Sequence, residues 1–186
     1  MHRREALAFL GTAVLAPLLS PLSAQERYAL GAELHARIAR DQAPGQALSA
    51  AQMALVTALS DALLPRTDTP GAVDLGVPKF VDLLLAEWYP DTLRAEILTG
   101  LDAIDARAVA MGGRPFAELD AGRRAELLTG LDRREHPDDP AEVIWRPLRD
   151  QIVFGYLTSK PIAELLRTTP IIPGRYDGCV PVGAPR

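Results

Sequence analysis

Cysteine, histidine and aromatic residues are scarce in this sequence of 186 residues. It contains one cysteine and three histidines, and Phe, Trp and Tyr together make up 5% of it. Long runs of β-branched residues are also missing, whereas Leu and Ala are abundant, and this balance favours helices over strands. The hydrophobic share of 48% and the charged share of 24% are ordinary for a soluble globular protein. We therefore predict an all-α protein with a single compact helical domain of about five or six helices.

The sequence also lacks the motifs that hold common cofactors. It has no GxGxxG after a strand, no P-loop, no CxxC or CxxCH, no HExxH and no GxSxG. Each of these motifs supplies groups for a nucleotide, flavin, haem, zinc or acyl-transfer site. We therefore predict no catalytic, cofactor-binding or metal-binding residue in this chain.

Positive charge is not in excess. The formal net charge is −4, and no Lys/Arg cluster stands out. A nucleic acid or an anionic membrane surface would require a basic face on the protein. The charge pattern therefore predicts no nucleic-acid partner.

The first 24 residues have the pattern of an export signal. Met1–Arg4 is short and basic, Ala6–Leu19 is almost entirely apolar, and a helix break follows before a small residue. The pair Arg3–Arg4 resembles the twin-arginine type of signal, which carries folded proteins across the membrane. We therefore predict a twin-arginine signal at 1–24 and a periplasmic protein. The apolar run is shorter than the ~20 residues that span a membrane, but Leu22 is bulky for a cleavage site, so retention as an anchor stays an alternative.

Helical patterns follow one another along the rest of the chain. Apolar residues recur at three- and four-residue spacing, and capping or turn residues separate the segments. We expect an N-terminal helix and linker in residues 25–48, and a helical small-subunit domain with a C-terminal tail in residues 49–186. The expected helices lie within 25–45 and at about 49–64, 78–89, 91–112, 116–131 and 141–158.

Prolines predict interruptions near the C-terminus. Pro147 lies inside the last expected helix and should kink it or split it in two. The segment Pro161–Arg186 is rich in proline and glycine, so we expect an irregular tail that contains only a short apolar turn at Ile162–Leu166.

Turn-forming residues fill the segment Leu64–Phe80, around which the rest of the chain is arranged. Pro65 ends the preceding helix, the pair Pro70–Gly71 suits a tight turn, and Pro78 suits the first turn of the next helix. Short polar side chains between them can bond nearby backbone N–H groups. We therefore predict an irregular loop that is ordered.

Isolated histidines and carboxylates receive no functional role. His35 has no second ligand at helical spacing, so we interpret it as a solvated surface histidine. Asp102 and Asp105 form a helical pair, which we interpret as part of a solvated face. His136 lies beside two aspartates in a loop without distant partners, so we expect no metal site there.

Three segments of the chain, in this order, resemble one protein family: ALSDALLPRTDTPGAVDLGVPKFVDLLL, GYLTSKPI and PGRYDGCVP. They are similar to segments of the small subunit, or subunit 3, of bacterial gluconate 2-dehydrogenase. The resemblance covers roughly Ser49 to Pro181. The positions that match the family are Pro65, Asp68, Pro70, Gly71, Val77, Pro78, Phe80, Tyr156, Thr158, Ser159, Gly174, Tyr176, Gly178 and Cys179.

This resemblance implies a periplasmic complex of several subunits. A separate large flavoprotein that binds FAD oxidises a sugar, sugar acid or polyol, and a cytochrome c subunit with haem c, where present, takes the electrons onward. The small subunit of this family carries no cofactor and helps the large subunit to fold and to pass through the twin-arginine export machinery. The resemblance therefore predicts a non-catalytic accessory subunit, whose partners set the substrate and the electron acceptor.

We expect the loop and the tail to form the partner-facing surface, because rigid turn residues present side chains at a low ordering cost on binding. Cys179 is the only cysteine, and in an exported protein it predicts an intersubunit disulfide or a free thiol, with a buried inert thiol as the alternative. The interface candidates are Pro65, Asp68, Pro70, Gly71, Asp74, Pro78, Phe80, Tyr156, Ser159, Tyr176 and Cys179.

A second hypothesis belongs to a different class of function. The chain would be a free-standing exported helical enzyme or ligand-binding protein that uses Asp68, Asp74 and Tyr176 around the loop. A large flavin-containing partner supports the first hypothesis, and turnover by the monomer alone supports the second.

Overall fold

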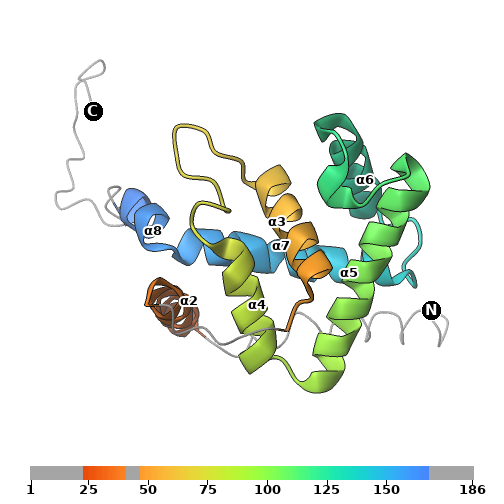
Figure 1. The fold of residues 1–186 in the computed structure, drawn as a ribbon. Coiled ribbons are helices and arrows are strands. Elements are labelled where there is room, and N and C mark those ends of the chain that lie inside the picture. The colour runs from red at the N-terminus through yellow and green to blue at the C-terminus, as the bar shows by residue number, and fades with distance from the viewer. Residues whose placement is uncertain (1–22, 41–46, 168–186) are drawn as a thin grey trace, which may run out of the picture.

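The computed structural model describes residues 23–40 and 47–167. This part of the chain is all helical and contains no strand, which confirms the predicted all-α class, although its seven α-helices exceed the five or six predicted. None of its helices is long and apolar enough to cross a membrane. The predicted export signal and most of the predicted tail lie outside the described residues, and the division at residues 24 and 48 stays a prediction. The described residues form seven α-helices and a short 3-10 helix: α2 (Ala24–Ala39), α3 (Ala50–Leu63), α4 (Val77–Trp88), α5 (Asp91–Gly112), η1 (Phe116–Glu118), α6 (Ala121–Arg133), α7 (Pro140–Thr158) and α8 (Lys160–Arg167). The α-helices are labelled in Figure 1.

Capping boxes begin α2 and α3. The Ser49 hydroxyl accepts a hydrogen bond from the Gln52 N–H at 3.3 Å, and the Gln52 side chain accepts one from the Ser49 N–H at 3.0 Å, as the sequence predicts. Ser23 and Glu26 form the same arrangement at the start of α2. Each box satisfies two N–H groups that the first helical turn would leave unpaired. The cap of α2 therefore includes Ser23, which lies in the segment predicted to be the signal.

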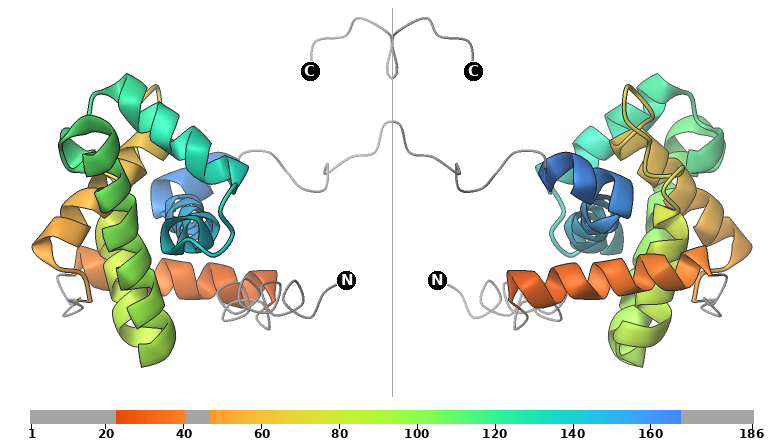
Figure 2. Two further views of the ribbon diagram at one scale, coloured as in Figure 1. Left: turned by 90° about the vertical axis from the view of Figure 1, so that its right-hand side faces the viewer. Right: turned by 90° about the vertical axis from the view of Figure 1, so that its left-hand side faces the viewer.

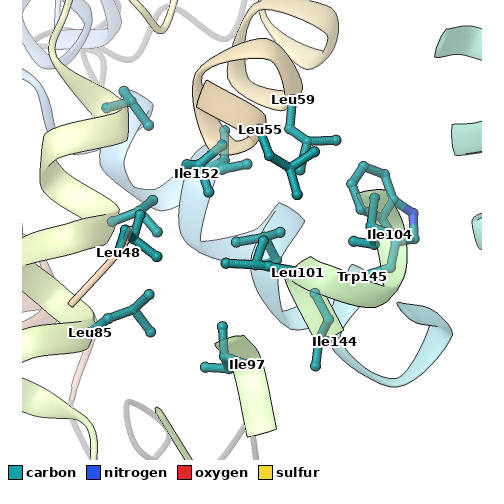
Figure 3. Packing of buried hydrophobic residues seen from close by; sticks show 14 of the residues in the cluster. Leu48, Leu55, Leu59, Leu85, Ile97, Leu101, Ile104, Ile144, Trp145 and Ile152 are labelled. Carbon is teal, nitrogen blue, oxygen red and sulfur yellow. The ribbon is translucent and has the colours of Figure 1, made fainter. Parts of the chain in front are cut away.

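Helix α7 is the central helix of the bundle. It packs against α2, α4, α5, α6 and α8. Figure 2 shows α7 nearly end-on, with α2 crossing below it. The inward face of α7 carries Ile144, Trp145 and Ile152, which are at most 1% exposed and lie among leucine and isoleucine side chains of the other helices (Figure 3). Burying a large apolar side chain contributes roughly 1.5–3 kcal/mol, so this face anchors the fold.

Two glycines let other helices approach α7 closely. A Cβ on Gly155 of α7 would lie 2.7 Å from Cδ1 of Phe80, and a Cβ on Gly100 of α5 would overlap the side chain of Ile144. Phe80 and Ile144 are almost completely buried and have no space to move into. Glycine at these two positions therefore sets the spacing of α4 and α5 on α7.

The structure differs from two predictions about the C-terminal helices. Of the kink or split predicted at Pro147, the split does not occur, because α7 is continuous from Pro140 to Thr158. Its packing against five other helices outweighs the loss of one backbone hydrogen bond. The segment Lys160–Arg167 forms helix α8 and not an irregular turn. Proline is tolerated in the first helical turn, where Pro161 lies, and Ile162 and Ala163 are buried.

His35 is not the solvated surface histidine that the sequence predicts. It is half-buried between α2 and α7, where its Nε2 donates a hydrogen bond to the Gly155 carbonyl oxygen at 2.6 Å. Its ring stacks on Phe80 with 4.9 Å between the ring centroids. Burial lowers the pKa of His35, and the hydrogen bond to Gly155 opposes this effect only in part. His35 therefore helps to fasten α2 to α4 and α7.

Two carboxylates accept hydrogen bonds from backbone N–H groups in the segments that connect helices. Asp82 is buried and accepts hydrogen bonds from the N–H groups of Ala47 and Leu48, both at 2.8 Å. Asp105 accepts one from the Phe116 N–H at 2.8 Å and is half-buried, so its interpretation as a solvated residue is wrong. Leaving a buried N–H without a partner would cost about 1–3 kcal/mol. These two carboxylates therefore fix the entry to α3 and to η1.

Candidate functional site

The loop between α3 and α4 closes on itself through backbone hydrogen bonds. The Ala72 N–H donates to the Leu64 carbonyl oxygen at 2.9 Å, and the Val77 N–H donates to the Ala72 carbonyl oxygen at 3.0 Å. Ala72 is fully buried, so both ends of the loop are fixed at one point of the core. The tip between Leu64 and Ala72 extends away from α3 and α4 (Figure 1).

An ion pair spans the inside of the loop. Asp74 Oδ2 accepts hydrogen bonds from Arg66 Nε at 2.9 Å and from the Gly71 N–H at 2.8 Å, and Asp74 Oδ1 lies 2.6 Å from Arg66 Nη2. The hydrogen bond from Arg66 lowers the pKa of Asp74 most, and the Gly71 N–H lowers it further. Asp74 therefore remains a carboxylate at neutral pH and holds both sides of the tip together.

Two glycines are required by the backbone of the loop. A Cβ on Gly71 would lie 2.7 Å from the Arg66 nitrogen and 3.2 Å from the Leu64 carbonyl oxygen. Gly76 precedes α4 with a φ of 71°, a left-handed conformation that favours glycine. A larger residue at position 71 would displace the backbone of the loop, and one at position 76 would be strained in the left-handed conformation.

Tyr156 joins the loop to the central helix. Its hydroxyl donates a hydrogen bond to the Pro70 carbonyl oxygen at 3.2 Å and lies 3.3 Å from the Thr69 hydroxyl. Tyr156 comes from α7, which packs against most of the other helices. The structure thus brings together Pro70 and Tyr156, two predicted interface residues that are 86 positions apart.

The predicted interface residues divide into two groups by exposure. Those on or beside the surface are Pro65, Asp68, Pro70 and Asp74, which are exposed, and Tyr156, which is half-buried. The buried residues are Gly71, Pro78, Phe80 and Ser159. In this conformation they cannot touch a partner directly. Which of the predicted interface residues contact a partner stays a prediction. Tyr176 and Cys179 lie outside the described residues.

The buried residues have structural roles that the sequence did not reveal. Phe80 is fully buried and packs edge-on against Phe154 with 5.6 Å between the ring centroids. The Ser159 carbonyl oxygen accepts a hydrogen bond from the Ala163 N–H at 2.9 Å and so forms the corner between α7 and α8. Phe80 thus belongs to the core between α4 and α7, and Ser159 belongs to the support of α8.

A buried carboxylate at the N-terminal end of α7 was also missed. Glu142 is 3% exposed and accepts hydrogen bonds from the His136 N–H at 2.6 Å and from Arg107 Nη2 at 2.9 Å. Burial acts to raise the pKa of Glu142, but these two hydrogen bonds hold it below its ordinary value. Arg107 and Glu142 are 35 positions apart and on different helices, so no local spacing indicates the pair.

A family model described as Gluconate 2-dehydrogenase subunit 3 matches residues 50–174. The chain belongs to this family. The match confirms the resemblance of the sequence and identifies the protein as an accessory subunit of a dehydrogenase complex. It begins at the first residue of α3 and includes the whole loop, whereas α2 precedes it. None of the curated proteins and none of the solved structures matches the chain.

In this subunit 3 protein, two of the three residues of the second hypothesis lie in the described loop. Asp74 is engaged by Arg66 and Gly71, and Asp68 is exposed at the tip. Tyr176 is outside the described residues. Among residues 23–40 and 47–167, no group of His, Cys, Asp and Glu side chains is placed to hold a metal ion. The internal hydrogen bonds of the loop suit it to presenting a fixed surface.

Proposed function

We propose that this subunit 3 protein is the non-catalytic small subunit of a periplasmic FAD-dependent dehydrogenase complex, gluconate 2-dehydrogenase-like, that acts on a sugar, sugar acid or polyol. It assists the folding, assembly and twin-arginine export of the large flavoprotein subunit. The large subunit binds FAD, and a cytochrome c subunit, where present, carries haem c. Membership of the subunit 3 family supports the accessory role, and the predicted signal supports export.

The self-bonded loop is the observation that carries this proposal. Its Asp74 carboxylate, its closing N–H groups and its Pro70 carbonyl are already hydrogen-bonded within the subunit. A surface with these bonds in place loses little conformational entropy when a partner binds. The exposed residues Pro65, Asp68 and Pro70 are therefore presented to a large subunit in a fixed arrangement.

A covalent tether is part of the same proposal. Disulfides form in oxidising compartments such as the periplasm, and Cys179 is the only cysteine of this chain. A disulfide between Cys179 and the large subunit would make the contact at the loop effectively intramolecular and so lengthen the lifetime of the complex. The bond would form after export, because cytoplasmic thiols are kept reduced.

Purification from the periplasm tests the proposed function. A tagged copy of the chain is expressed together with the genes beside it, and flavin absorbance and dye-linked dehydrogenase activity are measured in the purified material. We expect a large flavin-containing subunit to copurify. Replacing both Arg3 and Arg4 by lysine should leave this flavoprotein in the cytoplasm. A monomer without flavin that turns over substrate alone would support the second hypothesis instead.

A further inference from the structure

A cleft of about 490 Å³ lies between α5 and α6. Its walls include Arg107 and Met111 from α5, and Glu126, Leu127, Gly130 and Arg133 from α6. No residue of the loop between α3 and α4 contributes to it. The cleft is therefore a feature separate from the candidate interface described above.

Gly130 is not explained by packing within the described chain. It lies inside α6, where glycine is less favourable than alanine by about 1 kcal/mol. A Cβ built on Gly130 meets nothing within 4 Å, whereas Gly100 and Gly155 are required by close contacts with other helices. A bare helix backbone beside an open cleft allows another chain to approach closely. Gly130 therefore points to a binding surface.

The floor of the cleft is apolar. Met111 is 38% exposed, although it is a large apolar residue, and Leu127 is 7% exposed. Methionine is unbranched and flexible, so it adapts to the shape of a bound side chain. These two residues give the cleft a place for an apolar group beside Gly130.

One positive charge on the rim of the cleft has no partner among the described residues. Within the described part of the chain, the Arg133 side chain is exposed and makes no ion pair or hydrogen bond. Arg107 is held in place behind it by Glu142 and Asp139, at 2.9 Å and 3.0 Å. Glu126 is the one carboxylate among the lining residues. The unpaired Arg133 therefore favours a ligand with a carboxylate.

We propose that this cleft binds a segment of the large flavoprotein subunit in which an apolar side chain is followed closely by a carboxylate. The apolar side chain lies over Gly130, between Met111 and Leu127, and the carboxylate pairs with Arg133. This inference rests on the proposed function, because it names the same partner. It adds a second contact to the one at the loop, and two linked contacts strengthen a complex more than either does alone.

Binding by purified subunits tests the cleft. Gly130→Leu fills the space with a residue that favours helix, and Arg133→Glu reverses the charge on the rim. Each change should raise the Kd for the purified flavoprotein by at least about tenfold, as expected when an interface contact of about 1.4 kcal/mol is lost. Arg146→Glu on α7 is the matched control, because Arg146 is exposed, does not line the cleft and should leave the Kd unchanged.

Further measurements separate the possible outcomes. Gly130→Ala should unfold at the same or a higher temperature than the parent chain, which shows that α6 does not itself need glycine. A photoreactive amino acid in place of Met111 should crosslink to the flavoprotein, and a crosslink only to a second copy of this chain would contradict the proposal. An unchanged Kd in folded Gly130→Leu and Arg133→Glu variants would overturn the cleft alone. Failure of the parent chain to bind any flavoprotein would overturn both proposals.

Discussion

The hydroxyl of Tyr156 donates a hydrogen bond to the carbonyl oxygen of Pro70, with 3.2 Å between the two oxygens. Tyr156 is half-buried on the central helix, and Pro70 is exposed at the tip of the loop. The hydrophobic core therefore sets the position of a surface feature directly. This bond connects the fold to the surface on which we expect the large subunit to bind.

Tyr156→Phe should loosen the loop without unfolding the subunit. The change removes the hydroxyl but keeps the ring, so the free energy of unfolding should fall by about 0.5–1.5 kcal/mol in urea titrations. Trypsin should cleave faster after Arg66, which is exposed in the loop, and mass spectrometry of the fragments measures this rate. Cleavage after Arg133 is the internal reference and should not change. An unchanged rate after Arg66 would show that Tyr156 does not hold the tip.

Replacing Pro70 and Gly71 together by alanine should impair assembly more than folding. The new Cβ at position 71 would lie 2.7 Å from the Arg66 nitrogen, so the tip has to move. We expect the recovery of the exported complex to fall more than the helical signal in circular dichroism.

Gly113→Ala is a suitable control for this experiment. Gly113 also has a φ of 71°, but it follows α5 and a Cβ there meets nothing within 4 Å. The left-handed conformation should cost an alanine about 1–2 kcal/mol of stability while recovery of the complex is maintained. Equal losses of helix content and complex in the loop variant would mean that the loop is only structural.

His35 should make the stability of the subunit depend on pH. Its pKa in the folded protein is lowered, first of all by burial, so at mildly acidic pH the unfolded chain binds more protons at this position than the folded one. The free energy of unfolding should therefore fall as the pH decreases through the ordinary histidine pKa of about 6.5, with a slope of at most about 1.4 kcal/mol per pH unit.

Two variants isolate the effect of His35. His35→Gln should remove the contribution of His35 to the pH dependence of the free energy of unfolding between about pH 7 and pH 5, where histidine titrates. His35→Asn is the second variant, because asparagine also lacks a titrating group and should remove the same part of the slope, while His136 is left unchanged because its ring lies 3.5 Å from the buried Glu142 carboxylate. A slope that is the same in His35→Gln and the parent chain would contradict the prediction.

Cys179 should form a disulfide with the large subunit in the exported complex. Non-reducing electrophoresis of the purified complex should show a band at the sum of the two subunit masses. The band should disappear with reductant and in Cys179→Ser. Separate subunits in the absence of reductant would show that the thiol is free or buried, and the loop would then hold the complex without a tether.

Local signals in the sequence were sufficient to predict where most of the helices begin and end. The capping box at Ser49, the break at Pro65 and the glycines at 112 and 113 predict helix ends that the structure has within one or two residues. Capping and proline geometry act within one helical turn, so neighbouring residues determine them. The order of motifs around the loop was also sufficient to indicate the subunit 3 family, which the family model confirms.

Tertiary packing determined the structure at the positions where those local signals failed. Pro147 is a helix breaker by local rules, yet α7 continues through it because the helix is packed on several sides. His35 looked like a surface residue, yet it bonds to Gly155, which is 120 positions away. Phe80 belongs to the family motif, but only the structure shows that it is buried in the core against His35 and Phe154. The spacing of apolar residues shows which face of a helix is buried, whereas the contacts of a flanking residue depend on which other helices pack beside it.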